Sequence, residues 1–161
     1  MTDFSGLLQV LSRAGVDYIL VGGVAATAHG SSRLTQDIDV VYSRSNENLD
    51  RLASALEPLK PYLRGAPGGL PFSWDAATIR QGLNFTLTTD LGELDLLGEI
   101  IGGGGYEELL PHTSTLDLFG AKCLCLTLEK LIDVKRAAGR PKDLESIAEL
   151  EALLDERKTD P

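Results

Sequence analysis

The sequence predicts an α/β fold in which helices flank a short mixed sheet. Short apolar runs rich in β-branched residues, typical of buried strands, alternate with stretches whose apolar residues recur at helical spacing. Residues 83–97 also alternate apolar and polar side chains on both sides of a turn at 90–92, which predicts a hairpin and so a mixed sheet. A length of 161 residues suits one compact domain, which we expect to span residues 1–161.

In the first half of the chain, helices and strands are expected in turn. Apolar residues at helical spacing predict an amphipathic helix over residues 3–14. The apolar run 16–21 predicts a buried strand, which Gly22 and Gly23 interrupt. The elements expected next are a short helix over 24–29, a strand over 37–42, a helix over about 47–59 capped by Ser45 or Asn46, a loop with one short strand over 60–80, and the hairpin over 83–97.

In the second half, the glycines at 102–105 predict a mobile connection that leads into a helical turn. The apolar segment 116–127 is strand-like. Two closing helices are expected over about 127–157. Thr127 is the expected N-cap of the first and Gly139 its end, while Pro141 stands in the first turn of the second.

The composition limits the classes of partner. A formal net charge of −9 argues against broad, non-specific nucleic-acid binding, which needs many basic residues against phosphates. Basic residues nevertheless concentrate in segment 122–142, where a polyanionic ligand would find a local basic lining. No apolar run has the length of a membrane span, and the first residues lack a secretory pattern. Cys123 and Cys125 are expected to be buried thiols, and we expect a cytoplasmic protein.

Two carboxylates interrupt the apolar run 37–42. Residues i and i+2 of a strand share a face, so Asp37 and Asp39 point one way while Ile38 and Val40 point the other. Buried carboxylates are costly and repel each other unless a cation compensates them. Carboxylates together with substrate phosphates are typical ligands of Mg²⁺. The alternative is that both aspartates are solvated at a strand end.

A third carboxylate is expected from the hairpin. Asp95 stands between Leu94 and Leu96, again a single acid among apolar residues, whereas Glu93 lies nearer the turn and is expected to be solvated. Three carboxylates on adjacent strands can hold two divalent ions, as an in-line phosphoryl or nucleotidyl transfer requires.

The paired glycines precede these carboxylates by thirteen intervening residues. Gly22 and Gly23 follow a strand and open a helix, where bare amide groups can bind a phosphate. The pair is neither a dinucleotide-binding fingerprint nor a P-loop, because the further glycines and the Gly-Lys-Ser/Thr sequence are missing.

The segment from Gly22 to Tyr42 resembles the signature of the DNA polymerase β-like nucleotidyltransferase superfamily, a G-[GS] pair followed by D-h-[DE]-h, with a third acid on a later strand. It is more similar to a small bacterial stand-alone branch that includes AbiEii-like toxins of toxin–antitoxin pairs. The closing stretch 128–150, with its lysine-bearing helix, an arginine and an aspartate, supports this resemblance. The implied fold is the polymerase β-like nucleotidyltransferase fold.

The resemblance implies a Mg²⁺-dependent nucleotidyltransferase that moves a nucleoside monophosphate from a nucleoside triphosphate onto a hydroxyl of tRNA or protein. Gly22 and Gly23 would cradle the β- and γ-phosphates, Asp37 and Asp39 would ligate both ions, and Asp95 would ligate the catalytic one and help deprotonate the acceptor. An antitoxin protein is a further implied partner.

Three basic residues are candidates for contact with the nucleotide. Arg33 precedes the aspartate pair, and Lys135 lies on an otherwise apolar helix face. Arg140 either pairs with Asp143 in a salt bridge or contacts the nucleotide. Val24 departs from the family pattern, because many members carry Ser or Thr there to contact the triphosphate. Two alternatives remain: a nucleotide- or partner-binding module without turnover, and a two-metal phosphohydrolase, which would usually carry more histidine ligands.

Overall fold

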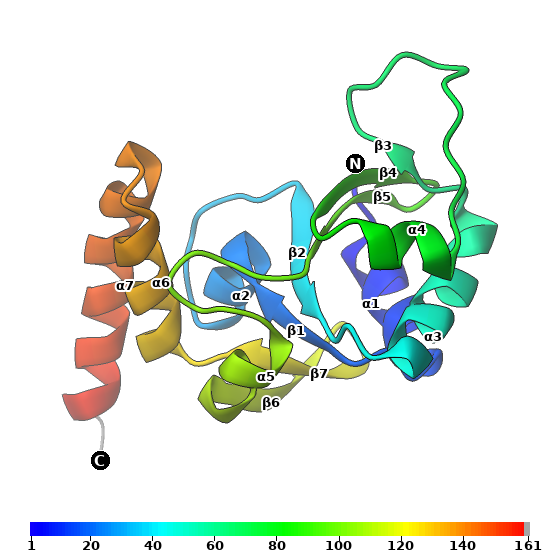
Figure 1. Ribbon diagram of the computed structural model, residues 1–161. Coiled ribbons are helices and arrows are strands. Elements are labelled where there is room, and N and C mark those ends of the chain that lie inside the picture. Colours follow the sequence, from blue (N-terminus) through cyan, green and yellow to red (C-terminus); the bar gives the residue numbers. More distant parts are fainter. Residues whose placement is uncertain (160–161) are drawn as a thin grey trace.

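The computed structural model describes residues 1–159, which form one seven-stranded sheet with helices packed around it (Figure 1). The strands are β1 (Tyr18–Val21), β2 (Asp37–Tyr42), β3 (Tyr62–Leu63), β4 (Phe85–Thr89), β5 (Gly92–Leu97), β6 (Thr113–Leu118) and β7 (Ala121–Leu126), in the order β3-β4-β5-β2-β1-β7-β6.

The strands at the centre of the sheet differ in direction. β2 runs antiparallel to β1 and parallel to β5, and β1 runs parallel to β7. The β4–β5 and β6–β7 pairs are antiparallel hairpins, and β3 pairs antiparallel with β4. The expected α/β architecture with a mixed sheet is confirmed.

The helices follow the predicted order with one addition. Ser45 accepts a hydrogen bond from the Asn48 amide, and Thr127 accepts one from the Lys130 amide, so both expected N-caps are present. Gly139 ends its helix at φ 67°, a left-handed conformation that glycine adopts without strain. The helices are α1 (Phe4–Arg13), α2 (Gly22–Ala28), α3 (Asn46–Leu56), α4 (Ala76–Gln81), α5 (Tyr106–Leu109), α6 (Leu128–Ala138) and α7 (Pro141–Thr159), with 3₁₀ turns at Glu57–Leu59 and Leu110–His112.

Three local expectations are corrected by the structure. α2 begins at Gly22, directly after β1, rather than at residue 24. The segment 60–80 contains α4 besides its short strand. With six residues and a single buried side chain, Ile79, this helix is too short for a periodic pattern. The strand-like stretch 116–127 belongs to a hairpin, whose turn holds Phe119 and Gly120 at φ 52° and 80°.

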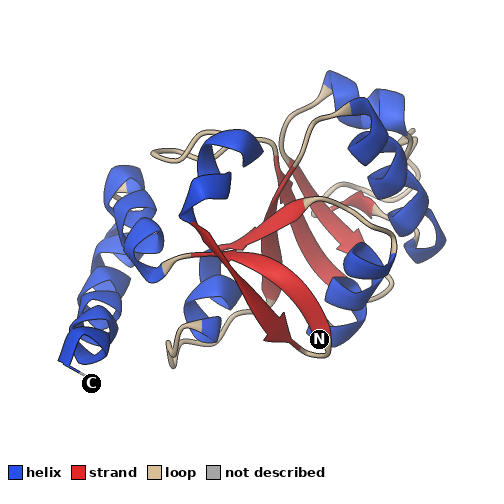
Figure 2. Ribbon diagram, turned by 90° about the horizontal axis from the view of Figure 1, so that it is seen from below, coloured by secondary structure: helices blue, strands red, loops and turns tan. Residues whose placement is uncertain are grey.

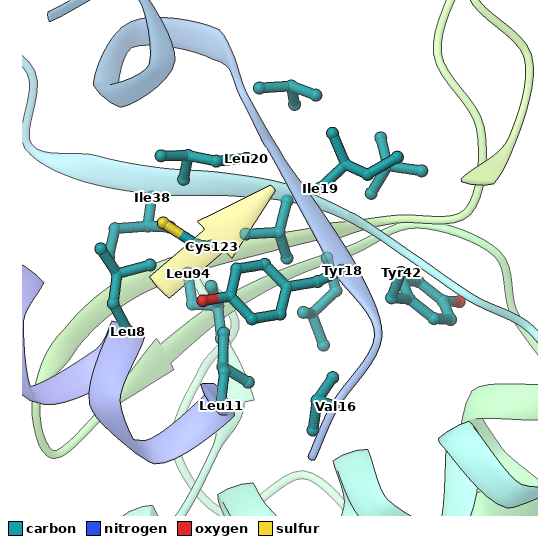
Figure 3. Packing of buried hydrophobic residues seen from close by; sticks show 14 of the residues in the cluster. Leu8, Leu11, Val16, Tyr18, Ile19, Leu20, Ile38, Tyr42, Leu94 and Cys123 are labelled. Carbon is teal, nitrogen blue, oxygen red and sulfur yellow. The ribbon is translucent and has the colours of Figure 1, made fainter. Parts of the chain in front are cut away.

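The main core lies against the apolar side of the central strands. Leu8 and Leu11 of α1 project toward Tyr18 and Ile38 (Figure 3), and Leu8, Leu11 and Ile38 are fully buried. Each such leucine contributes about 1.5–3 kcal/mol to the free energy of unfolding. Asp37 and Asp39 lie on the opposite side of β2, where both side chains are half-buried.

A second, smaller core joins the closing helices to α2. α6 and α7 pack side by side at one end of the molecule (Figure 2), and their apolar faces enclose Ala26. The members of this core are Ala26, Leu128, Ile132, Ile147 and Leu150. This packing brings α6 next to α2, so that Leu131, Val134 and Lys135 of α6 line one cavity with Val21 and Gly22.

The two cysteines are free and buried, as expected. Burial raises the pKa of Cys123, and raises that of Cys125 to about 12, so neither thiol ionises near neutral pH. None of the helices within residues 1–159 combines the length and apolar character of a membrane span.

Candidate active site

Three aspartates converge on one side of the sheet. Asp37 and Asp39 alternate with buried residues along β2, and the parallel pairing of β2 with β5 places Asp95 directly beside Asp39. One carboxylate oxygen from each of the three lies within 4.8 Å of the others. The cluster therefore depends on strand register, because a one-residue slip of β5 would turn Asp95 to the opposite face.

The electrostatics of this cluster favour a cation. Burial first, then the hydrogen bond and charge of Asp95 and the charge of Asp37, together raise the pKa of Asp39 to about 8, although the charge of Arg64 lowers it. Within residues 1–159, the buried oxygen Oδ1 of Asp39 has no hydrogen-bond partner. A carboxylate that is buried, crowded by like charges and unsatisfied needs a positive ligand. Hard divalent cations with oxygen preference meet this need.

The paired glycines let the start of α2 approach the cluster. A Cβ atom on Gly22, at φ +70°, would lie 2.1 Å from Asp39 Oδ2, so only glycine fits there. A Cβ on Gly23 would lie 2.8 Å from Thr35 Oγ1. No side chain within residues 1–159 caps the first turn of α2, whose N-cap is Val21. The glycine pair and the aspartates are thus one local unit.

Arg64 joins the aspartates, and the sequence interpretation did not anticipate it. Its guanidinium lies 2.9 Å from Asp95 and 3.7 Å from Asp37, and its Nε lies 3.6 Å from Glu93. Its Nη2 also donates to the carbonyl of Leu87 at 2.8 Å. No motif or periodicity in the sequence marks Arg64, which follows a two-residue edge strand, as a residue of the site. Only the pairing of β3 with β4 brings it here.

A cavity of about 430 Å³ opens beside Asp39 and Gly22. Side chains of β5, β7 and α6 give it an apolar wall, and three charged residues face it from the closing helices and their connection. The apolar wall includes Leu97, Ile100, Leu126, Leu131 and Val134, and the charged residues of the closing segment are Lys135, Arg140 and Asp143; the acids Asp39 and Glu99 also line the cavity. A partly apolar pocket that ends at a carboxylate cluster fits a ligand with a flat apolar part and a charged part.

The basic residues of this cavity are organised by Asp143. Arg140 Nε donates to Asp143 Oδ2 at 2.6 Å, which is the first of the two alternatives expected for Arg140, and Lys135 Nζ lies 3.9 Å from Asp143 Oδ1. Burial opposes ionisation of Asp143, but the hydrogen bond and charge of Arg140 hold its pKa below the ordinary value. Burial lowers the pKa of Lys135, which Asp143 partly offsets. The side chain of Lys135 is 19% exposed.

Some candidates from the sequence lie away from this group. Arg33 is exposed, and it is not among the described residues that line the cavity. Its charge still reaches Lys135, whose pKa it lowers slightly. Val24 is 5% exposed and packs in the main core. Gly22, Lys135 and Arg140 do lie around the cavity with Asp39.

Comparison with solved structures identifies the fold of this chain. A scan against protein-family models and a search of curated proteins find no match. Among solved structures, the lincosamide antibiotic adenylyltransferase LnuA, bound to lincomycin, is similar with a TM-score of 0.59 and 17% identity, over 92% of this chain and 94% of that chain. An antigenic nucleotidyltransferase-like protein from Paracoccidioides brasiliensis matches with a TM-score of 0.58 and 20% identity, over 92% of this chain and 73% of that chain. ANT(2")-Ia, in complex with adenylyl-2"-tobramycin, matches with a TM-score of 0.52 and 16% identity, over 91% and 90% of the two chains. The chain has the nucleotidyltransferase fold.

Proposed function

We propose that this protein is a nucleotidyltransferase, which transfers a nucleoside monophosphate from a nucleoside triphosphate to a hydroxyl group of an acceptor. The observation that carries the proposal is the convergence of Asp37, Asp39 and Asp95 within 4.8 Å, next to a cavity with basic residues. Structures of the same fold include an adenylyltransferase and a complex with an adenylylated product. The fold alone does not define a reaction, so the proposal depends on the site.

The three aspartates are suited to hold magnesium. They offer hard oxygen ligands, one of them buried and unsatisfied. Position 22 has to be glycine, because a Cβ atom there would clash with the Asp39 carboxylate. When bound there, magnesium would neutralise phosphate charge and favour ionisation of the acceptor hydroxyl.

The remaining roles belong to the chain itself. The free amides of Gly22 and Gly23 bind phosphate oxygens, and Lys135 and Arg140 balance the charge of the leaving pyrophosphate. Asp95 accepts the proton of the acceptor hydroxyl. A bond forms from the acceptor oxygen to the α-phosphorus as the bond between that phosphorus and the bridging oxygen breaks. The apolar wall of the cavity packs against the base and limits access of water.

Two observations bear on the identity of the acceptor. The resemblance to small bacterial toxins favours a hydroxyl of tRNA or of a protein, and with it an antitoxin as partner. The structural neighbours LnuA and ANT(2")-Ia carry small antibiotic molecules in their structures. We propose a macromolecular hydroxyl acceptor and treat small aminoglycosides and lincosamides as the competing outcome. Since Val24 is buried where many relatives carry Ser or Thr, binding without turnover is the second candidate function.

Thermal unfolding with each of the four nucleoside triphosphates, with and without Mg²⁺, tests the proposal. A triphosphate at one hundred times its Kd raises the free energy of unfolding by about 2.7 kcal/mol. The double variant D37N/D39N should lose the Mg²⁺-dependent rise. Asp90→Asn makes the same change at an exposed turn and should keep it. If no triphosphate stabilises the wild type in Mg²⁺, the proposal is wrong.

Transfer is then measured with the triphosphate that stabilises the protein, labelled at the α-phosphate. Bulk tRNA, a protein extract, an aminoglycoside and a lincosamide are offered in separate reactions. Label in one acceptor, lost in D37N/D39N, identifies the class. Stabilisation by a triphosphate without label in any acceptor supports the binding module instead.

A further inference from the structure

We propose that Arg64 is an internal counter-ion that occupies the carboxylate cluster in the metal-free protein, so that a divalent cation binds only as the Arg64 side chain withdraws. This inference rests on the proposed metal site of the three aspartates. It adds a competing group within the chain, which sets the affinity of that site.

The sheet register places Arg64 on the same face as the aspartates. Its amide donates to the carbonyl of Thr86 at 2.9 Å, which continues the β3–β4 ladder by one residue. Thr86 pairs with Asp95, and Asp95 pairs with Asp39. These four residues therefore form one row across four strands, and side chains in such a row point the same way. The long arginine side chain crosses β4 to reach the carboxylates.

The guanidinium contacts the same carboxylates that a cation would use. It forms ion pairs with Asp37 and Asp95, two of the three members of the cluster, and with Glu93 at its edge. A metal ion within about 2.1 Å of these oxygens would stand next to a positive charge that is only 23% exposed. Repulsion at such a distance is strong in a half-buried site. Simultaneous occupancy in the present geometry is therefore unfavourable.

The arginine nevertheless compensates the cluster incompletely. Among residues 1–159, Arg64 Nε, Asp39 Oδ1 and Asp95 Oδ1 are buried without a well-aligned hydrogen bond. The contact between Arg64 and Asp95 at 2.9 Å is therefore an ion pair in which the N–H group is poorly aligned for a hydrogen bond. A group that balances charge without satisfying its partners is readily displaced by a better ligand.

Withdrawal requires movement of the side chain only. The backbone of Arg64 is held by the Thr86 carbonyl, while its neighbours Gly65, Gly68 and Gly69 have open space where a Cβ would lie. The guanidinium can therefore swing toward solvent while β3 stays paired. The segment that follows, up to α4, projects from the body of the molecule (Figure 1).

The test measures binding of Mg²⁺ and Mn²⁺ alone by calorimetry, together with thermal unfolding, and needs no activity. Arg64→Gln should bind either ion about tenfold more tightly than wild type, because one competing charge is removed. Without metal it should unfold at a lower temperature, and saturating metal should stabilise it more than wild type. Arg51→Gln, which removes an arginine from the exposed pair with Asp17, should change neither quantity.

Arg64→Lys serves where Arg64→Gln does not fold. A lysine keeps the charge but lacks the two-pronged head that spans Asp37 and Asp95, so metal affinity should rise severalfold. Equal or weaker metal binding in both variants would overturn the inference. Binding in Arg64→Gln but not in wild type would support it. If neither protein binds metal, both the inference and the proposed function are wrong, whereas wild-type binding lost in D37N/D39N with no effect of Arg64→Gln rejects the inference alone.

Discussion

Asp39 of β2 and Asp95 of β5 are register partners in a parallel strand pair, and both lie on the side of the sheet opposite Ile38 and Leu94. Paired residues of two neighbouring parallel strands point to the same side of the sheet. Two acids that are 56 positions apart in the sequence therefore become adjacent. Asp37 joins them through the two-residue period of β2. The acid cluster thus combines one local relationship with one that depends on register.

Gly22→Ala is expected to destabilise the protein strongly, because its Cβ would meet the Asp39 carboxylate at 2.1 Å. The left-handed backbone alone costs an alanine about 1–2 kcal/mol, and overpacking adds about 1–3 kcal/mol. Gly69→Ala is the matched control, since Gly69 has φ +86° and open space around it. Denaturant unfolding of both variants separates the two contributions. Equal losses would show that Asp39 yields to the new methyl group.

Asp39→Asn is expected to stabilise the metal-free protein and to abolish its response to Mg²⁺. Asparagine keeps the shape but removes a carboxyl group whose ionisation burial and two neighbouring acids disfavour in the folded protein, while the unfolded chain ionises freely at neutral pH. The gain should be about 0.5–2 kcal/mol, as is typical when strain at a functional site is relieved. Urea unfolding at neutral pH, with and without Mg²⁺, measures both effects. A clear loss of stability in the absence of metal would contradict the claim that the Asp39 carboxyl destabilises the metal-free protein.

Lys135→Met is expected to weaken triphosphate binding at least about tenfold while it leaves binding of Mg²⁺ alone unchanged, because Lys135 faces the cavity and lies outside the carboxylate cluster. Stability should change little, since the loss of the Asp143 contact at 3.9 Å is offset by relief of lysine burial. Calorimetric titration gives both affinities. Lys142→Met, at an exposed position on α7, is the control. An unchanged triphosphate affinity in Lys135→Met would remove this residue from the site.

His29 makes the protein sensitive to mild acid. Its Nε2 lies 2.7 Å from the Leu126 carbonyl and its Nδ1 lies 2.9 Å from an Arg157 nitrogen. The ring must therefore donate to the carbonyl and accept from the guanidinium, which fits only the neutral form. Burial lowers the pKa of His29, the Leu126 carbonyl and Glu129 oppose this, and Arg157 adds to it.

The sign of the effect follows by linkage. The folded pKa lies below the ordinary 6.5, so the unfolded chain takes up the proton first as the pH falls. Stability from neutral His29 is present above pH 6.5 and is lost as the pH falls below it. Unfolding free energies measured from pH 7.5 to 5 should decline, and His29→Gln should flatten that decline. An identical slope in both proteins would assign it to other groups.

The sequence by itself determined the local parts of this protein. The period of residues 37–42 put Asp37 and Asp39 on one face, and the caps at Ser45, Thr127 and Gly139 marked helix ends, because these features depend on neighbouring residues only. Strand alternation likewise predicted the β4–β5 hairpin. The mixed sheet followed from these elements and their order, whereas the nucleotidyltransferase fold was implied by the resemblance of the segment from Gly22 to Tyr42 to that family's signature.

Tertiary structure decided what depends on pairing between distant segments. The place of Asp95 beside Asp39 is a matter of register, and Arg64 reaches the cluster only because a two-residue edge strand pairs with β4. The turn at Phe119 is held by the long β6–β7 ladder although a non-glycine residue disfavours it. Such contacts depend on how distant strands pack and pair in the assembled sheet. A short stretch of sequence carries no information about this pairing.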